Sequence, residues 1–319
     1  MVEPTFEEIE SDQVQARAAW LYFIGGMTQK DVAEELGITR LRVNKIIAQV
    51  RAEGLVRIEL RLALGSSAEL EQRLKQRFGL AGAVVVPALS DPLAQQRTIG
   101  EAAGELINGM IGGRDIGIGI GWGRTLSFAT RRLTARTSPR SWVVGLMGGV
   151  TRASDTNTFE VATAIARSLG VECHYLTAPI YCSSIESREA LLHNDEIADV
   201  LARTEIADVA LISCGDLSER SPVTALRVVK DHFDDISRLG AVGEVLGCFL
   251  RADGTPVPHF LNEAIMAMPL EALRLKPVSV LASGGIHKAA AMHAVLKGRY
   301  VNRLVTDETV ARILLERPA

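Results

Sequence analysis

The sequence has few cysteines and no long hydrophobic run, and each absence excludes a class of protein. Its four cysteines form no CxxC pair, so their spacing indicates neither a disulfide framework nor a thiolate zinc site. No apolar stretch reaches the roughly 18 residues that a membrane-spanning helix requires. The N-terminal residues MVEPTFEEIESD lack the basic and apolar segments of a secretory signal, so we expect a cytoplasmic protein.

Strong charge of one sign is also missing. The net charge is -3 over 319 residues, so the whole chain exerts no general attraction on nucleic acid, and any polyanion must bind a local patch. Such a patch occurs between Ile38 and Arg61, where six basic residues accompany only two acidic ones. With 47% hydrophobic residues, the chain is long enough for one small and one large domain.

Residues 27–54, MTQKDVAEELGITRLRVNKIIAQVRAEG, predict two short helices joined by a tight turn. Thr28 and Asp31 have the spacing of a capping box, and Gly37 supplies the turn. Thr39 can cap the second helix, whose Val43, Ile46, Ile47 and Val50 share one face. We interpret this pattern as a helix-turn-helix, which places the first residues of its second helix in the major groove of DNA. The alternative is a helical hairpin whose charged faces are merely solvated.

The segment LVRIELRL, residues 55–62, alternates like a strand and predicts a wing, with Arg57 and Arg61 placed to touch phosphates. The long side chains of the second helix that donate hydrogen bonds would contact the edges of the bases. The predicted DNA-binding residues are Thr28, Gln29, Thr39, Arg40, Arg42, Asn44, Lys45, Gln49 and Arg57.

Beyond residue 80 the sequence consists of short apolar runs separated by stretches that predict helices. The runs AVVVP, IGIGI, WVVGLMGG, VALISCG and VSVLASGG mostly end in glycine, which predicts a Rossmann-like, doubly wound parallel α/β sheet. We expect a DNA-binding domain at residues 1–61, a linker helix at 62–80 and a ligand-binding and oligomerisation domain at 81–319. Ligands of such sheets bind beyond the carboxyl ends of the strands.

Four strand ends are candidates for this ligand site. They are the loops Gly121–Thr125, Met147–Gly149 with the polar residues Thr151–Asn157 after it, Ser213–Asp216 and Ser283–Lys288. Backbone amides in the first loop can hold an anion at a helix N-terminus, with Arg124 adding charge. Lys288 can neutralise a phosphate or bond a hydroxyl, although a solvated surface role is the alternative. For the polar residues after Met147–Gly149, ordinary turn and capping chemistry is an equal alternative.

Other ligand chemistries fit poorly. GIGIGWGR only approximates the dinucleotide fingerprint and lacks the acidic residue about 20 positions later, and no GxxxxGK[ST] loop occurs. We therefore expect no nucleotide cofactor, and the sequence predicts no metal site. The six histidines form no convincing catalytic triad, and His193, His232 and His293 lie in segments that predict helix surface.

Together these segments resemble the SorC family of sugar-responsive bacterial transcription regulators, over nearly the whole chain. The resemblance is carried by TQKDVAEELGITRLRVNKII, GWGRT, ADVALISCG and, most specifically, LASGGIHKAAAMHAVLKGRYVNRLVTDETVARILL. It implies a fold similar to sugar-phosphate isomerases and glucosamine-6-phosphate deaminase, with a pocket that senses a carbohydrate. The implied or candidate ligand-binding residues are Trp122, Gly123, Arg124, Thr125, Gly148, Gly149, Asp155, Cys214, Gly215, Glu244 and Lys288.

One departure from the family bears on the effector. Phosphosugar-binding members usually carry small residues and paired threonines in the first loop, whereas this chain has Arg124 before a single Thr125. Met147–Gly149 also lacks an arginine, unless Arg152 supplies one. A bisphosphate is therefore disfavoured, and a sugar, polyol or sugar monophosphate stays open.

The sequence thus predicts an effector-controlled regulator of a carbohydrate or polyol operon. We expect a homodimer or homotetramer, because a pair of DNA-binding domains related by two-fold symmetry matches a palindromic operator. The rival hypothesis is a sugar-phosphate isomerase or deaminase with Glu244, Asp216 or His287 as acid-base groups. The N-terminal segment favours the regulator, because an enzyme of that kind has no use for base-directed donors.

Overall fold

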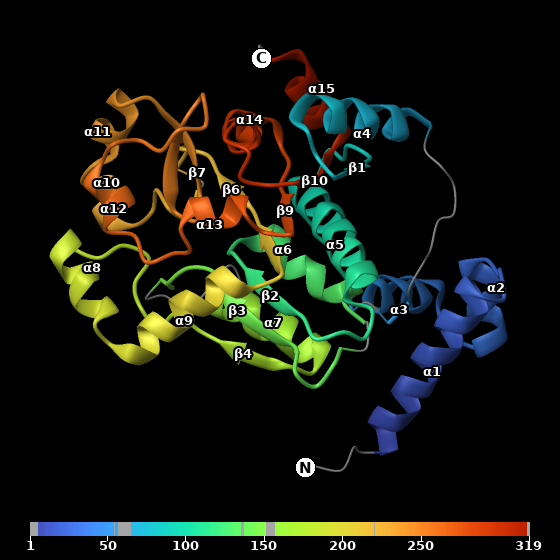
Figure 1. Ribbon diagram of the computed structural model, residues 1–319. Helices are drawn as coiled ribbons and strands as arrows, with labels where there is room; N and C mark the ends of the chain where they lie inside the picture. Colours follow the sequence, from blue (N-terminus) through green and yellow to red (C-terminus); the bar gives the residue numbers. More distant parts are fainter. Residues whose placement is uncertain are drawn as a thin grey trace. The chain divides into compact units, whose positions relative to one another are not determined.

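The chain forms two compact units, residues 1–63 and 64–319. The computed structural model describes residues 6–53, 55–56, 65–134, 137–150, 157–219 and 221–317 (Figure 1). Most of the predicted wing strand, together with Arg57, Arg61, Arg152 and Asp155, lies outside the described residues. No described helix is both long and apolar enough to cross a membrane.

The described part of the N-terminal unit contains three helices, α1 (Phe6–Phe23), α2 (Gln29–Leu36) and α3 (Arg40–Ala52). Thr28 and Asp31 form the predicted capping box, and Gly37 ends α2 in the left-handed conformation with φ of 63°. The Thr39 hydroxyl accepts a hydrogen bond from the Arg42 amide at 3.2 Å, so it caps α3 as predicted. The boundaries of both short helices are therefore fixed by residues that the sequence identifies.

One apolar cluster holds these three helices together. It joins Ala18 and Ala19 of α1 to Val32 and Ala33 of α2 and to the predicted inner face of α3, which consists of Val43, Ile46, Ile47 and Val50. Each of these side chains is buried, and the residues between them on α3 are exposed. The amphipathic pattern thus sets the outward face of α3.

The larger unit is built on a seven-stranded parallel sheet in the order β1-β10-β9-β5-β2-β3-β4. Its strands are β1 (Gly82–Val86), β2 (Gly117–Ile120), β3 (Trp142–Gly145), β4 (Glu172–His174), β5 (Val209–Ile212), β9 (Val278–Ala282) and β10 (Arg303–Asp307). The five predicted apolar runs supply β1, β2, β3, β5 and β9.

Alternate side chains of these strands enter two different cores. Val209, Leu211 and Val280 pack with α5 (Pro92–Ile111), α6 (Arg124–Ser127) and α7 (Thr158–Leu169). Ala210, Ile212 and Leu281 face the other core, with α4 (Gly65–Phe78), α14 (Ala289–Lys297) and α15 (Glu308–Glu316). Both faces are covered, which explains why β2, β5 and β9 are short, largely apolar runs.

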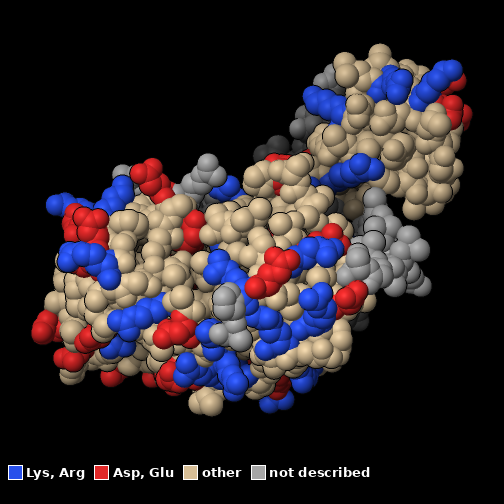
Figure 2. All heavy atoms as spheres, turned by 90° about the horizontal axis from the view of Figure 1, so that it is seen from above, with Lys and Arg blue, Asp and Glu red and all other residues tan. Residues whose placement is uncertain are grey.

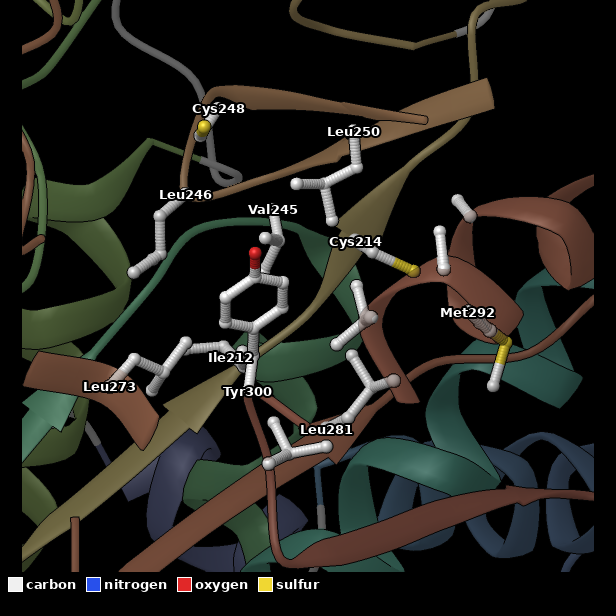
Figure 3. Packing of buried hydrophobic residues seen from close by; sticks show 14 of the residues in the cluster. Ile212, Cys214, Val245, Leu246, Cys248, Leu250, Leu273, Leu281, Met292 and Tyr300 are labelled. Atoms are coloured by element: carbon white, nitrogen blue, oxygen red, sulfur yellow. The ribbon is translucent and has the colours of Figure 1, made fainter. Parts of the chain in front are cut away.

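A second, antiparallel sheet of three strands lies beside the first and was not predicted. It consists of β6 (Cys214–Gly215), β7 (Ala241–Val245) and β8 (Cys248–Arg251). Val245 and Leu250 of this sheet, and Leu246 in the turn between β7 and β8, pack with residues of β5, β9 and α14 around the buried Tyr300 (Figure 3). Short helices fill the remaining connections: α8 (Ile185–Leu192), α9 (Asp195–Ile206), α10 (Arg227–Lys230), α11 (Phe233–Arg238), α12 (Phe260–Glu263) and α13 (Leu270–Arg274), with 3-10 turns at Phe128–Arg132 and Ile286–Lys288.

Two features of the larger unit differ from expectation. The helix expected as a linker, α4, packs on β1 and α15 through the buried Leu70 and Leu74, so it is part of the larger unit. His293 is 6% exposed and meets the ring of Phe78 edge-on, so its assignment to a helix surface is wrong. The alanine-rich α14 that carries it is buried along most of its length.

Candidate functional site

Three glycine loops meet at the carboxyl edge of the parallel sheet. They follow β2, β5 and β9, and these strands are direct neighbours in the order β9-β5-β2. From β2 the chain continues outward to β3 and β4, whereas from β5 it continues in the other direction to β9 and β10. The loops therefore lie at a switch point of a doubly wound sheet, where such folds bind their ligands.

A cavity of about 270 Å³ lies between these loops. Its polar lining combines two carboxylates, three basic side chains and several hydroxyls. The lining residues are Pro92, Gln96, Trp122, Gly123, Arg124, Thr125, Ser213, Cys214, Gly215, Asp216, Ser221, Pro222, Glu244, His287 and Lys288. A cavity of this size and composition suits a small polar molecule.

The first loop reaches the cavity through a backbone turn that favours glycine. Gly123 has φ of 115°, and α6 begins at the next residue. Trp122 and Thr125 are buried on either side, while the Arg124 side chain is exposed. Because α6 is only four residues long, the charge at this corner comes mainly from Arg124 rather than from the helix dipole.

The loop that follows β5 contacts Glu244. Gly215 of β6 pairs with Glu244 of β7, and a Cβ on Gly215 would lie 2.4 Å from the Glu244 Oε1 atom. Only glycine permits this approach without a shift of the carboxylate. The Gly247 amide donates a hydrogen bond to the Glu244 Oε2 atom at 2.7 Å, which fixes the carboxylate in the hairpin between β7 and β8.

Burial raises the pKa of Glu244 from 4.5 to about 7. The amides of Gly247 and Gly215 and the positive charge of Lys288 oppose this shift, while Asp216 adds to it. Burial dominates because the residue is only 2% exposed. Near neutral pH, Glu244 can therefore accept or donate a hydrogen bond to a hydroxyl in the cavity.

Cys214 lies beside this carboxylate and is held as a neutral thiol. Burial raises its pKa to about 11, although Lys288 and the hydroxyl of Ser283 oppose the shift. The Cys214 Sγ atom donates to the Ser283 Oγ atom at 3.6 Å. Since the thiolate is the reactive form of cysteine, this residue is a packing group of the cavity wall rather than a nucleophile.

Two residues that line the cavity each have a buried polar atom with no protein partner among the described residues. These atoms are the Oε1 atom of Gln96, on α5, and the Oγ atom of Ser221. Ser221 is 4% exposed, so its hydroxyl has little access to bulk water. Buried polar atoms nearly always have a partner in native proteins, and a small movement of either side chain toward the cavity would let a polar ligand or water supply one.

The cavity brings together most residues that the sequence proposed for ligand binding. Trp122, Gly123, Arg124, Thr125, Cys214, Gly215, Glu244 and Lys288 all line it. Gly148 and Gly149 do not; their amides donate to the carbonyls of Met266 and Ala178, in a tightly packed connection where a side chain would clash. Asp155 is outside the described residues.

Sequence reasoning missed four lining residues: Pro92, Gln96, Ser221 and Pro222. Pro92 and Gln96 belong to α5, whereas Ser221 and Pro222 lie between β6 and α10. None of them ends a strand of the main sheet, so the expectation that ligands bind at the carboxyl ends of the strands could not identify them. Their lack of a local signal reflects their position in connections that fold over the cavity.

On the N-terminal unit, α3 presents a polar face. Arg40, Arg42, Asn44, Lys45 and Gln49 are all exposed, as predicted from the helix period. Gln49 donates to Glu53 at 2.9 Å, so it is partly engaged within the helix. On the larger unit, by contrast, basic and acidic side chains are interspersed over the face in view (Figure 2). The exposed face of α3 thus carries hydrogen-bond donors of the kinds that can contact DNA bases.

Comparisons with known proteins cover both units of the chain. A family described as "Putative sugar-binding domain" matches residues 63–316. The chain is 32% identical to the transcriptional regulator LsrR of Klebsiella pneumoniae, over 96% of this chain and 94% of that protein. It is 31% identical to the erythritol catabolism regulatory protein EryD of Brucella abortus, over 96% and 98% of the two chains.

Solved structures show the same architecture. The full-length sorbitol operon regulator SorC from Klebsiella pneumoniae matches 96% of this chain and all of its own, with a TM-score of 0.73 and 26% identity. A transcriptional regulator from Streptococcus pneumoniae covers 79% of this chain, with a TM-score of 0.73 and 22% identity, and this likeness concerns the fold alone. The first match spans both units of the chain.

Proposed function

Since the chain belongs to the SorC family of sugar-binding transcriptional regulators, we propose that its N-terminal unit binds an operator and that a small carbohydrate in the cavity controls this binding. The chain is a sugar-responsive, DNA-binding transcriptional regulator. The operator, the effector and the residues that contact them are the proposed part. The observation that carries the effector site is a cavity that Glu244 and Lys288 line together with Gln96 and Ser221, whose side chains each have an unpartnered polar atom.

In this proposal α2 and α3 form a helix-turn-helix, with α3 in the major groove. Arg40, Arg42, Asn44 and Lys45 read bases, because they lie on the exposed face near the start of α3. Thr28 and Gln29, at the start of α2, contact the DNA backbone. Arg57, in a wing, is proposed as a further phosphate contact.

The effector is proposed to be a sugar, a polyol or a sugar monophosphate. Glu244 accepts hydrogen bonds from adjacent hydroxyls, which is how carboxylates hold diols, and Ser221 and Gln96 complete the polar contacts. Lys288 and the exposed Arg124 are placed to bind a phosphate at the cavity mouth. Trp122 supplies an apolar surface for the carbon skeleton.

We further propose a homodimer or homotetramer on a palindromic operator, because a protein two-fold axis matches a DNA two-fold axis. The erythritol regulator in Brucella abortus is named for polyol catabolism, which supports a carbohydrate or polyol operon as the target. The competing idea of an isomerase or deaminase has less support, since the relatives are transcriptional regulators.

A ligand screen tests the effector site. Purified protein is heated with a panel of sugars, polyols and their monophosphates, and unfolding is followed by fluorescence. A ligand at 100 times its dissociation constant adds about 2.7 kcal/mol to the free energy of unfolding, which is readily detected. We expect at least one compound to raise the unfolding temperature, and we expect Lys288→Ala to abolish this stabilisation. Turnover of a hit compound without any operator binding would instead favour the enzyme.

A further inference from the structure

A side-chain cluster away from the strand-end cavity contains the donor set of a transition-metal site. His232, Asp235 and His259 each offer one ligand atom, and these atoms all lie within 4.8 Å of one another. None of the three lines the effector cavity. No other group of three histidine, cysteine or carboxylate side chains among the described residues lies close enough together to share an ion. We propose that it binds a divalent transition-metal ion of the Zn²⁺ class.

The donor chemistry selects this class of ion. Two imidazole nitrogens and one carboxylate oxygen are ligands that Zn²⁺ and neighbouring transition metals prefer, whereas Ca²⁺ and Mg²⁺ prefer oxygen alone. Three protein ligands leave a coordination position for water. All three residues are partly exposed, so an ion reaches them directly from solvent.

Asp235 is oriented for this role by its neighbour. Its Oδ1 atom accepts a hydrogen bond from Arg238, while its Oδ2 atom lies 3.9 Å from the Nδ1 atom of His232. One oxygen is thus held by a cation outside the cluster, and the other faces the histidine. Hydrogen bonds of this kind from surrounding residues are typical of carboxylates that coordinate metals.

The two imidazole rings pack together with one further aromatic ring. Phe260 packs against both, with its ring centroid 4.8 Å from that of His232 and 4.9 Å from that of His259. The histidine rings themselves are 5.4 Å apart. Donors around one tetrahedral Zn²⁺ are about 3.4 Å apart, because each lies about 2.1 Å from the ion. Small side-chain rotations therefore close the cluster on an ion.

His259 must also change its hydrogen bonding. Its Nδ1 atom accepts a hydrogen bond from the Leu261 amide at 3.3 Å, so in the neutral ring the proton is on Nε2. Coordination through Nε2 moves that proton to Nδ1, so Nδ1 no longer accepts this long bond from the Leu261 amide. Asparagine at position 259 retains a side-chain acceptor for the amide but cannot supply the imidazole, which makes it a suitable test substitution.

The site would clamp the hairpin that carries Glu244. His232 and Asp235 belong to the segment that enters β7, and His259 follows β8. α11 packs on β7 and α12 packs on β8, so one ion would tie the entry of the hairpin to its exit. This part of the inference rests on the proposed effector role of Glu244, whereas the metal site itself does not.

The test is metal binding by the full-length, tag-free chain. The protein is stripped with EDTA, desalted, and titrated with Co²⁺ and Zn²⁺; visible absorption reports the Co²⁺ coordination, and competition with a coloured chelator reports Zn²⁺ affinity. We expect one ion per chain. His232→Gln and His259→Asn should each weaken binding by at least about tenfold. His193→Gln removes an exposed histidine of α8's C-terminal end and should bind as the unmodified chain does.

Two results would overturn the proposal: no saturable binding by the unmodified chain, or binding that survives both substitutions unchanged. Thermal unfolding in EDTA shows whether each variant is folded, and either variant suffices if the other is not. Effector affinity, measured with and without Zn²⁺, then tests the clamp separately. An effector that binds regardless of a loaded metal site would refute the clamp but leave the proposed function intact.

Discussion

At the scale of single residues, Glu244 makes the stability of the larger unit depend on pH. Its pKa is raised by burial to about 7, whereas in the unfolded chain it ionises near 4.5. Between these values the folded state binds more protons than the unfolded state, so the free energy of unfolding falls as pH rises. The full loss, complete above pH 7, is on the order of 3 kcal/mol at about 1.4 kcal/mol for each pKa unit.

Glu244→Gln should therefore flatten the pH dependence of unfolding between pH 4.5 and 7 and stabilise the protein at pH 8. The amide keeps an acceptor for the Gly247 N–H group and carries no charge to desolvate. Urea unfolding at pH 5 and pH 8 measures the effect, and the exposed Glu263→Gln is the matched control. If the free energy of unfolding had the same pH dependence in the unmodified protein, Glu244→Gln and Glu263→Gln, then Glu244 would ionise as readily in the folded chain as in water.

Arg42 tests base reading by a single side chain. It is exposed in the first turn of α3, next to the Thr39 cap. Arg42→Ala should weaken binding to a selected operator by about 1–3 kcal/mol, because a bidentate contact to a base is lost, and should leave effector binding unchanged. Fluorescence anisotropy with operator and with random DNA measures both affinities. An equal loss on both DNAs would make Arg42 a phosphate contact instead.

At the scale of elements, the start of α3 depends on one hydroxyl. Thr39→Ala removes the acceptor for the Arg42 amide and should cost about 1 kcal/mol of local stability. Amide hydrogen exchange in α3 peptides should then be about fivefold faster, since local opening becomes easier by that amount. Thr39→Ser keeps the hydroxyl and should exchange at the original rate. Faster exchange in both variants would trace the effect to the lost methyl group.

The elements that the sequence predicted are those with local signals. Capping residues and the 3.6-residue period define α2 and α3, and continuous apolar runs define β1, β2, β3, β5 and β9. The strand Arg303–Asp307 and the short strand Glu172–His174 have weaker runs and were not predicted. The antiparallel sheet was missed because Cys214–Gly215 is only two residues long and pairs with β7 across a long stretch of intervening chain.

The candidate site was predictable to the extent that it is made of strand ends. The position of β5 between β2 and β9 brings the first, third and fourth glycine loops together, and no local pattern encodes that order. For the same reason the sequence could not separate the loop at Gly148, which follows β3, from the loops that line the cavity. Gln96 and Ser221 reach it only through tertiary packing of their connections.

At the scale of the whole molecule, the proposed function requires energetic coupling between the two units. If the effector changes the operator dissociation constant by some factor, then the operator must change the effector dissociation constant by the same factor. A tenfold change corresponds to about 1.4 kcal/mol of differential affinity, which a few hydrogen bonds in the cavity supply. This equality holds whether the effector releases the protein from DNA or tightens its grip.

We therefore expect equal factors from two independent titrations. Anisotropy gives the operator affinity with and without the effector found in the screen, and calorimetry gives the effector affinity with and without operator, at one salt concentration because DNA affinity varies steeply with salt. Lys288→Ala should lose the coupling in both titrations and keep the operator affinity of the effector-free protein, because Lys288 lies in the cavity and not on the N-terminal unit. Coupling that persists in this variant would mean that the effector acts elsewhere. Unequal factors in the unmodified protein would mean that the two titrations report different oligomers, and sedimentation under each condition would identify them.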